Sequence, residues 1–219
     1  MKTEKITQSN FIRRSSLAAV LGGALYVATE AVWHPIHELL ILGDSAALRQ
    51  PVEHAIHHLP ELPAYALLAL GLVGLVRCYG KSLGRVGRLG LYLAWIGFAL
   101  MSLGTLGIVL FEGVLGTSVD ALETVHPLLL LPLAGSLLCG PAILKAKVLS
   151  PAGAWLIISA ALMFLGLIFS GLIDTFWGYW VGKAVLTLFS AGWTWLGYAL
   201  WSQGRQVVRP AGPVSQAAG

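Results

Sequence analysis

Six long apolar stretches dominate this sequence, and each is long enough to cross a lipid bilayer as a helix. A hydrocarbon core about 30 Å thick requires about 20 apolar residues, because an α-helix rises about 1.5 Å per residue. Apolar residues follow one another here without the alternation that membrane barrel strands need. The sequence therefore predicts an all-α, polytopic integral membrane protein with a six-transmembrane-helix bundle. The expected spans run approximately from Leu17 to Leu42, Leu62 to Tyr79, Leu89 to Phe111, Val125 to Leu144, Ala152 to Ile173 and Tyr179 to Trp201.

Composition supports a chain surrounded by lipid. Charged residues make up 11% of the sequence and hydrophobic residues 57%, whereas soluble domains are about 25% charged. So few charges cannot cover a core with a polar surface. We expect one membrane domain over residues 1–204 and, because residues 205–219 are polar, rich in Pro, Gly and Ala and without periodicity, a disordered cytoplasmic tail.

The distribution of basic residues predicts the orientation. With the N- and C-termini cytoplasmic, all of the 14 Lys and Arg residues except Arg49 and Lys183 fall on the inner side. These residues would meet anionic membrane lipids, so the positive net charge requires no nucleic acid partner. Arg13-Arg14 before an apolar run is also typical of a signal peptide, but the lack of a clear cleavage site favours an uncleaved first helix. We expect a multi-pass protein of a plasma membrane, the bacterial inner membrane.

Histidines gather on the predicted outer side. Within the first span, Glu30, His34, His37 and Glu38 are three or four residues apart and share one helical stripe. Ionisable groups are costly in lipid, so this stripe is expected to face the bundle or a wet cavity. Pro35 removes the backbone hydrogen bond to Ala31, which predicts a kink or break in the helix.

A second histidine cluster lies between helices 1 and 2, bounded by Pro51 and Pro60. On a helical wheel its apolar residues occupy one arc and its Glu and His residues the other. The pattern predicts a short amphipathic surface helix on the outer membrane face. Its histidine side would point either to water or back over the end of helix 1.

Imidazole and carboxylate groups at these spacings are typical ligands of first-row transition metals, so Zn, Cu and Fe are the candidate cofactors. Haem is the less favoured group, because its axial ligands would have to lie deep between helices. The histidines could also be solvated or structural residues. Lys183 is expected to pair with Asp174 across the last hairpin. The candidate metal ligands are Glu30, His34, His37, His54, His57, His58 and His126.

These features favour a metal-binding membrane protein whose site opens to the extracytoplasmic face. It would be a metal-dependent enzyme, either an oxidoreductase or a hydrolase acting on a membrane-soluble substrate, or a subunit that holds a metal. The sequence leaves open whether the protein is an enzyme at all. One alternative is a structural or assembly subunit that associates with other membrane subunits. Another is a small transporter, for which Glu30 and a weak repeat of hairpin 3–4 in hairpin 5–6 are the only support.

Overall fold

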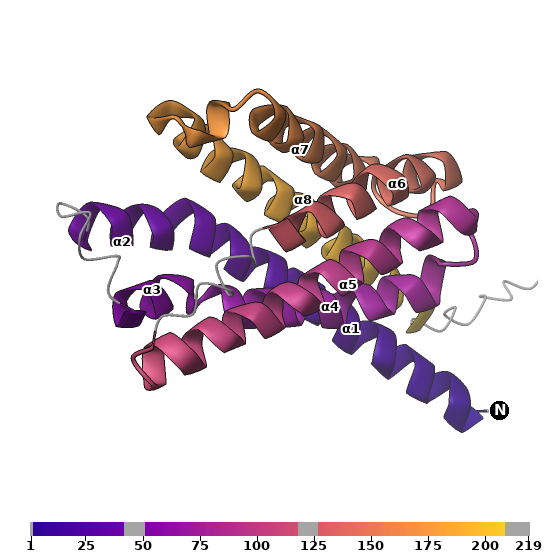
Figure 1. Cartoon of the computed structure of the whole chain (residues 1–219). Helices are drawn as coiled ribbons and strands as arrows, with labels where there is room; N and C mark the ends of the chain where they lie inside the picture. The colour runs from indigo at the N-terminus through magenta and orange to yellow at the C-terminus, as the bar shows by residue number, and fades with distance from the viewer. Residues whose placement is uncertain (1, 42–50, 118–126, 209–219) are drawn as a thin grey trace, which may run out of the picture.

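Helices make up nearly all of the structure, a computed structural model that describes residues 2–41, 51–117 and 127–208 (Figure 1). No strand occurs within these ranges, so the predicted all-α class is confirmed for them. The last helix continues to Val208, and residues 209–219 of the expected tail lie outside the described residues. The helices in chain order are α1 (Lys2–Ala28), η1 (Thr29–Trp33), α2 (His34–Ile41), α3 (Pro51–His58), α4 (Glu61–Tyr79), α5 (Gly84–Ile108), η3 (Val109–Val114), α6 (Leu130–Ala146), α7 (Pro151–Phe169), η5 (Leu172–Asp174) and α8 (Phe176–Val208).

Five helical segments in the described part of the chain are long and apolar enough to cross a membrane, as expected of a membrane protein. The sixth predicted span falls on α8, which has 33 residues but is not one of the five. Its Trp, Tyr, Gly, Ser and Thr residues stand between the aliphatic ones and lower its hydropathy. The sixth crossing and the cytoplasmic position of both termini stay predictions. The five segments are Asn10–Leu39, Pro51–Tyr79, Gly84–Val114, Pro127–Ala146 and Pro151–Phe169.

The long helices pack side by side in an order that closes on itself. α4 packs between α1 and α5, α6 between α5 and α7, and α8 between α7 and α1. Large aromatic side chains such as Phe98, Phe189 and Trp193 fill the interior and are fully buried. Leu103 and Leu162 point outward, with 64% and 57% of their surface exposed. A bundle with this much apolar surface on its outside is suited to lipid.

Glycines allow two of these helices to approach closely, as small residues commonly do where membrane helices touch. A Cβ atom added to Gly90 of α5 would lie 2.6 Å from the backbone oxygen of Gly135 in α6. A Cβ atom on Gly135 would lie 2.5 Å from the oxygen of Gly90. Any larger residue would therefore force α5 and α6 apart.

The first long helix changes its winding just before Pro35. Residues Thr29–Trp33 form the π-helical segment η1 between α1 and α2, and the backbone remains helical on both sides. The expected irregularity is thus present, as a local change of winding rather than a break. A wider turn accommodates the proline ring and its missing N–H while keeping the chain helical. Such π-helical turns often occur at functional sites, and η1 carries Glu30.

The predicted short helix between helices 1 and 2 is α3, which lies beside α2 at the end of the bundle opposite the N-terminal end of α1 (Figure 1). Its apolar residues Val52 and Ile56 are 45% and 37% exposed, whereas His57 and His58 are buried. Of the two orientations that the sequence allows, the histidines thus point inward. Only Leu59 and Pro60 separate α3 from α4, and the two helices together form one of the five candidate spans. A position on the membrane surface stays a prediction.

Candidate functional site

The polar stripe of the first long helix faces the interior of the bundle. Glu30, His34 and His37 are only 2%, 1% and 4% exposed. The change of winding at η1 lies within this stripe and helps to set the direction of Glu30 relative to His34. The expectation that these ionisable groups avoid lipid is therefore confirmed.

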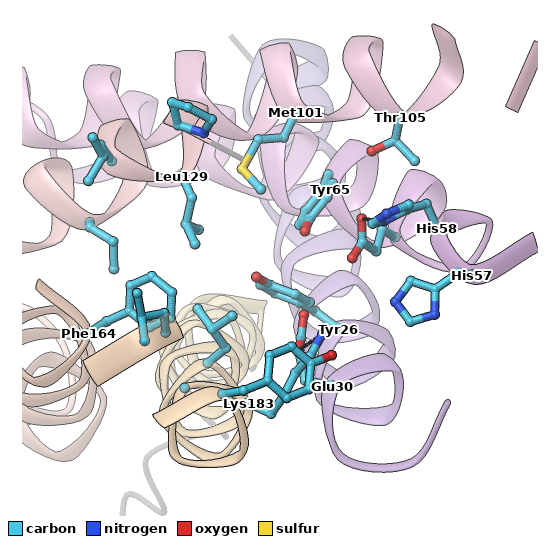
Figure 2. A pocket seen from close by; sticks show the side chains of 18 of the residues that line it. Tyr26, Glu30, His57, His58, Tyr65, Met101, Thr105, Leu129, Phe164 and Lys183 are labelled. Carbon is cyan, nitrogen blue, oxygen red and sulfur yellow. Dashed lines mark hydrogen bonds and ion pairs between the residues drawn. The ribbon is translucent and has the colours of Figure 1, made fainter. Parts of the chain in front are cut away.

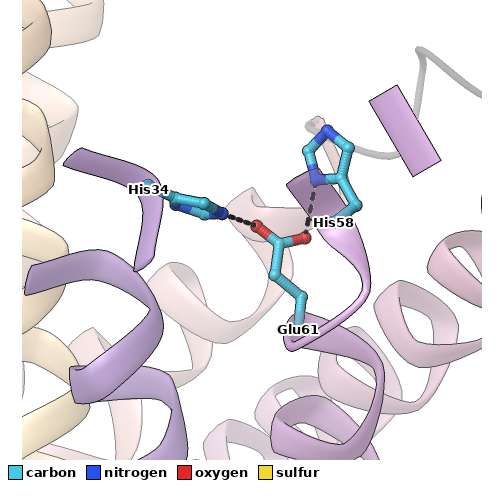
Figure 3. A group of neighbouring side chains, drawn as sticks. All are labelled: His34, His58 and Glu61. Atoms are coloured by element: carbon cyan, nitrogen blue, oxygen red, sulfur yellow. Dashed lines mark hydrogen bonds and ion pairs between the residues drawn. The ribbon is translucent and has the colours of Figure 1, made fainter. Parts of the chain in front are cut away.

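Three buried side chains from three helices meet at this end of the bundle: His34 of α2, His58 of α3 and Glu61 of α4 (Figure 3). The Nε2 atom of His34 is 3.3 Å from Oε1 of Glu61, and Nδ1 of His58 is 3.0 Å from Oε2 of the same carboxylate. One potential ligand atom from each residue lies within 4.8 Å of the other two. We call these three residues the His/Glu cluster.

The spacing of the His/Glu cluster suits a metal ion. Bonds of about 2.0–2.2 Å in a tetrahedral zinc site place neighbouring ligand atoms about 3.3 Å apart. The distances of 3.3 Å from His34 to Oε1 and 3.0 Å from His58 to Oε2 of Glu61 are close to this value, although they involve different carboxylate oxygens. The contact between His34 and Glu61 does not have hydrogen-bond geometry, and Nε2 of His34 is buried without a hydrogen-bond partner in the described part of the chain. A buried ring nitrogen is normally paired, and a metal ion or an ordered water would satisfy this one.

The opposite edge of the His34 ring is held by charged groups. Its Nδ1 atom is 3.3 Å from Oε2 of Glu30 and 2.7 Å from Nζ of Lys183, and that ammonium is 3.3 Å from the same carboxylate oxygen. Because an ammonium only donates, Lys183 at 2.7 Å donates to Nδ1, and the proton of a neutral His34 ring then lies on Nε2, on the side of Glu61. For Nε2 to bind a metal, this proton must be lost, or Nδ1 must turn from Lys183 and donate to Glu30. Metal-binding histidines are commonly oriented by a carboxylate in this way.

The charges around the cluster do not balance. Two buried carboxylates, Glu30 and Glu61, stand against the single ammonium of Lys183. With neutral histidines this group of residues therefore carries one excess negative charge. Burying an unbalanced charge is costly. A proton on one of the histidines would cancel the excess, and a divalent ion would cancel it if the ion also held one hydroxide.

His57 and His37 surround the cluster without joining it. The His57 ring stacks on that of His34, with centroids 4.2 Å apart. Its Nδ1 atom lies 3.2 Å from Nδ1 of His37, and its backbone oxygen accepts a hydrogen bond from the indole of Trp33. Glu38 is 3.9 Å from Nε2 of His57. These contacts fix the position of the ring against which His34 packs.

The remaining predicted ligands do not belong to the three-residue cluster. His54 pairs with Glu112 of η3 at 2.6 Å, and its ring packs edge-on against that of His58, with centroids 4.7 Å apart. His126 lies outside the described residues. Glu112 itself is 3% exposed, because η3 turns it inward against α3. Sequence reasoning missed Glu61 as a ligand, although its spacing of three residues from His58 is a signal of one shared helical face.

Lys183 has a different partner from the one expected. Asp174 is exposed, and the lysine instead reaches Glu30 and His34 across the bundle. The predicted pairing with Asp174 is therefore wrong. α8 packs against α1 and η1 along its length, so the side chain of Lys183 projects towards the first helix rather than back along its own hairpin.

A cavity of about 600 Å³ adjoins the site (Figure 2). Its polar end contains Glu30, His57, His58, Glu61 and Lys183, and the phenol rings of Tyr26 and Tyr65 stand beside these groups. The ring centroids of the two tyrosines are 5.1 Å apart. Its other end is lined by aliphatic and aromatic side chains of α5, α6, α7 and α8. A molecule in this cavity would contact charged groups at one end and hydrocarbon at the other.

Comparison of the chain with protein-family models, curated proteins and solved structures found no match.

Proposed function

We propose that His34, His58 and Glu61 hold one divalent transition metal, zinc by preference, and that the chain is a metal-dependent hydrolase for a membrane-soluble substrate. The observation that carries this proposal is the approach of three buried ligand atoms to within 4.8 Å at the polar end of a cavity. His58 and Glu61 both line that cavity. A metal held there would therefore be reached directly by a molecule inside it.

The ligand set favours hydrolytic chemistry. Two imidazoles and one carboxylate form the protein ligands of several catalytic zinc sites, in which a fourth position is left for water. A zinc ion there makes its bound water acidic, with a pKa of about 7, and so provides a nucleophile at neutral pH. In this chain, Glu30 would orient His34 from the second side of its ring. Lys183 would in turn hold Glu30 in place.

Metal analysis of the purified protein tests the proposal. We expect one metal ion per chain in the wild type and its loss in His34→Asn and Glu61→Gln, each of which removes one of three ligands. His54→Asn is the comparison variant: it removes a ring that packs against His58 but leaves all three ligands in place, so it should keep the metal. Metal-free wild-type protein whose melting temperature is unchanged by chelator or by added zinc would contradict the proposal.

The same experiment separates zinc from iron. Two histidines and one carboxylate also form the triad of non-haem iron oxygenases. Stoichiometric iron in place of zinc would favour the oxidoreductase alternative for the same residues. We further propose that the site faces the extracytoplasmic side of a plasma membrane, which the distribution of Lys and Arg in the loops supports.

A further inference from the structure

The cavity next to the His/Glu cluster has a polar end and an apolar end. The apolar side chains that line the cavity include Leu129, Leu133, Phe164 and Leu186, and all four are at most 9% exposed. Figure 2 shows Leu129 and Phe164 together at the apolar end, away from His57 and His58. Water gains little in such a compartment, because none of these side chains can hydrogen-bond to it.

A buried hydroxyl group also lines the cavity near its polar end. Thr105 of α5 lines the cavity, is 1% exposed, and its Oγ1 atom has no hydrogen-bond partner among the described residues. Figure 2 places it on the side of the cavity where His58 and Tyr65 lie. Buried hydroxyls are normally satisfied, and leaving one without a partner is costly. Thr105 thus offers a hydrogen bond to a molecule in the cavity, independently of any metal.

The apolar end is bordered by side chains that the surroundings of the bundle can reach. Leu130 of α6 and Ile168 of α7 also line the cavity and are 45% and 36% exposed. α6 and α7 are both long and apolar enough to cross a membrane. An apolar molecule dissolved in the bilayer would therefore meet hydrocarbon side chains on its way into the cavity.

We infer that the cavity binds a single-chain amphiphile, with its polar group at the His/Glu cluster and Thr105 and its alkyl chain between Leu129, Leu133, Phe164 and Leu186. The position of the polar group at a metal rests on the proposed function. The position of the alkyl chain is independent of that function, because it follows from the apolar lining alone. A volume of about 600 Å³ lies within the range of cavities that enclose small ligands.

A series of n-alkyl hydroxamic acids tests both parts in zinc-loaded protein in phospholipid nanodiscs. Acetohydroxamic acid carries only the metal-binding group, and longer members add methylenes that gain up to about fourfold in affinity each when buried. Longer alkyl chains also partition into the bilayer, which raises the apparent affinity of every variant equally. Only a difference in affinity between variants therefore reports on the cavity. Leu129→Trp fills the apolar end and should keep the affinity for acetohydroxamic acid while losing at least tenfold for the ten-carbon member.

Two further variants make the outcome unambiguous. Leu186→Phe repeats the filling at a second position, in case the larger tryptophan prevents folding, and Leu162→Trp, on the exposed face of α7, should behave as the wild type. If the affinity increased equally with alkyl-chain length in the wild type and in both filled variants, the inference that the cavity binds an amphiphile would be wrong. Failure of zinc or acetohydroxamic acid to bind would overturn the proposed function instead.

The position of the alkyl chain can also be tested in protein that holds no metal. Nitroxide-labelled dodecanoic acid should show an immobilised component in the electron paramagnetic resonance spectrum of chelator-treated wild type. That component should be lost in the filled variants and kept in Leu162→Trp. The same spectrum in the wild type and the filled variants would overturn the inference whether or not zinc binds.

Discussion

The ion pair between Glu30 and Lys183 gives a prediction whose size can be worked out from the structure. The two side chains are 2% and 16% exposed, and both also contact Nδ1 of His34. Glu30→Leu makes the helix more hydrophobic but removes the carboxylate that contacts the Lys183 ammonium, while the remaining carboxylate, Glu61, contacts His34 and His58 instead. Removing one partner of a buried pair costs about 3–5 kcal/mol, and Lys183→Met should destabilise the protein to a similar extent by isolating the carboxylate.

The double variant should be more stable than either single variant. Without both charges, the remaining cost is the unsatisfied Nδ1 atom of His34, about 1–3 kcal/mol. If Glu30 and Lys183 acted independently, the two losses would instead add to about 6–10 kcal/mol. The variants therefore distinguish a true pair from two separately important residues by several kcal/mol in the free energy of unfolding.

Equilibrium unfolding in mixed detergent micelles, followed by tryptophan fluorescence, would measure these differences. Chelator should be present throughout, so that loss of a metal does not contribute to the result. Asp174→Leu combined with Lys183→Met serves as the matched control and should show no coupling, because Asp174 is exposed and is not the partner of Lys183. Additive losses in the Glu30/Lys183 cycle, or a stable and fully active Glu30→Leu variant, would refute the argument.

Three further predictions concern packing, threading and the metal. Gly90→Ala should destabilise the bundle by about 1–3 kcal/mol through overpacking against α6, whereas Gly166→Ala, with open space around it, should not; thermal unfolding compares them. A reporter fused after Arg209 should be active only in the cytoplasm, and a cysteine at Ser118 should react with an impermeant reagent from outside; labelling of the tail from outside would contradict six spans. Metal content after dialysis should fall below about pH 6, because protons then compete for imidazoles whose usual pKa is about 6.5; metal retained at pH 5 would argue against histidine ligands.

The sequence by itself determined the elements and their environment. Continuous apolar runs of about 20 residues require helices in lipid, because backbone polar groups there must be satisfied within each segment. Spacings of three and four residues placed Glu30, His34 and His37 on one stripe, and the cost of charge in lipid turned that stripe inward. These inferences succeeded because they depend on one helix and its solvent, both of which local sequence describes.

Only the tertiary structure decided which polar groups meet. Glu61 joins His34, Lys183 joins Glu30 rather than Asp174, and Glu112 joins His54. In each of these pairs the partners belong to different helices. Their contact depends on how far each helix is rotated and shifted against its neighbours, and close packing at sites such as Gly90 sets these quantities. Helical periodicity specifies the face on which a side chain lies, but not the residue that faces it across the bundle.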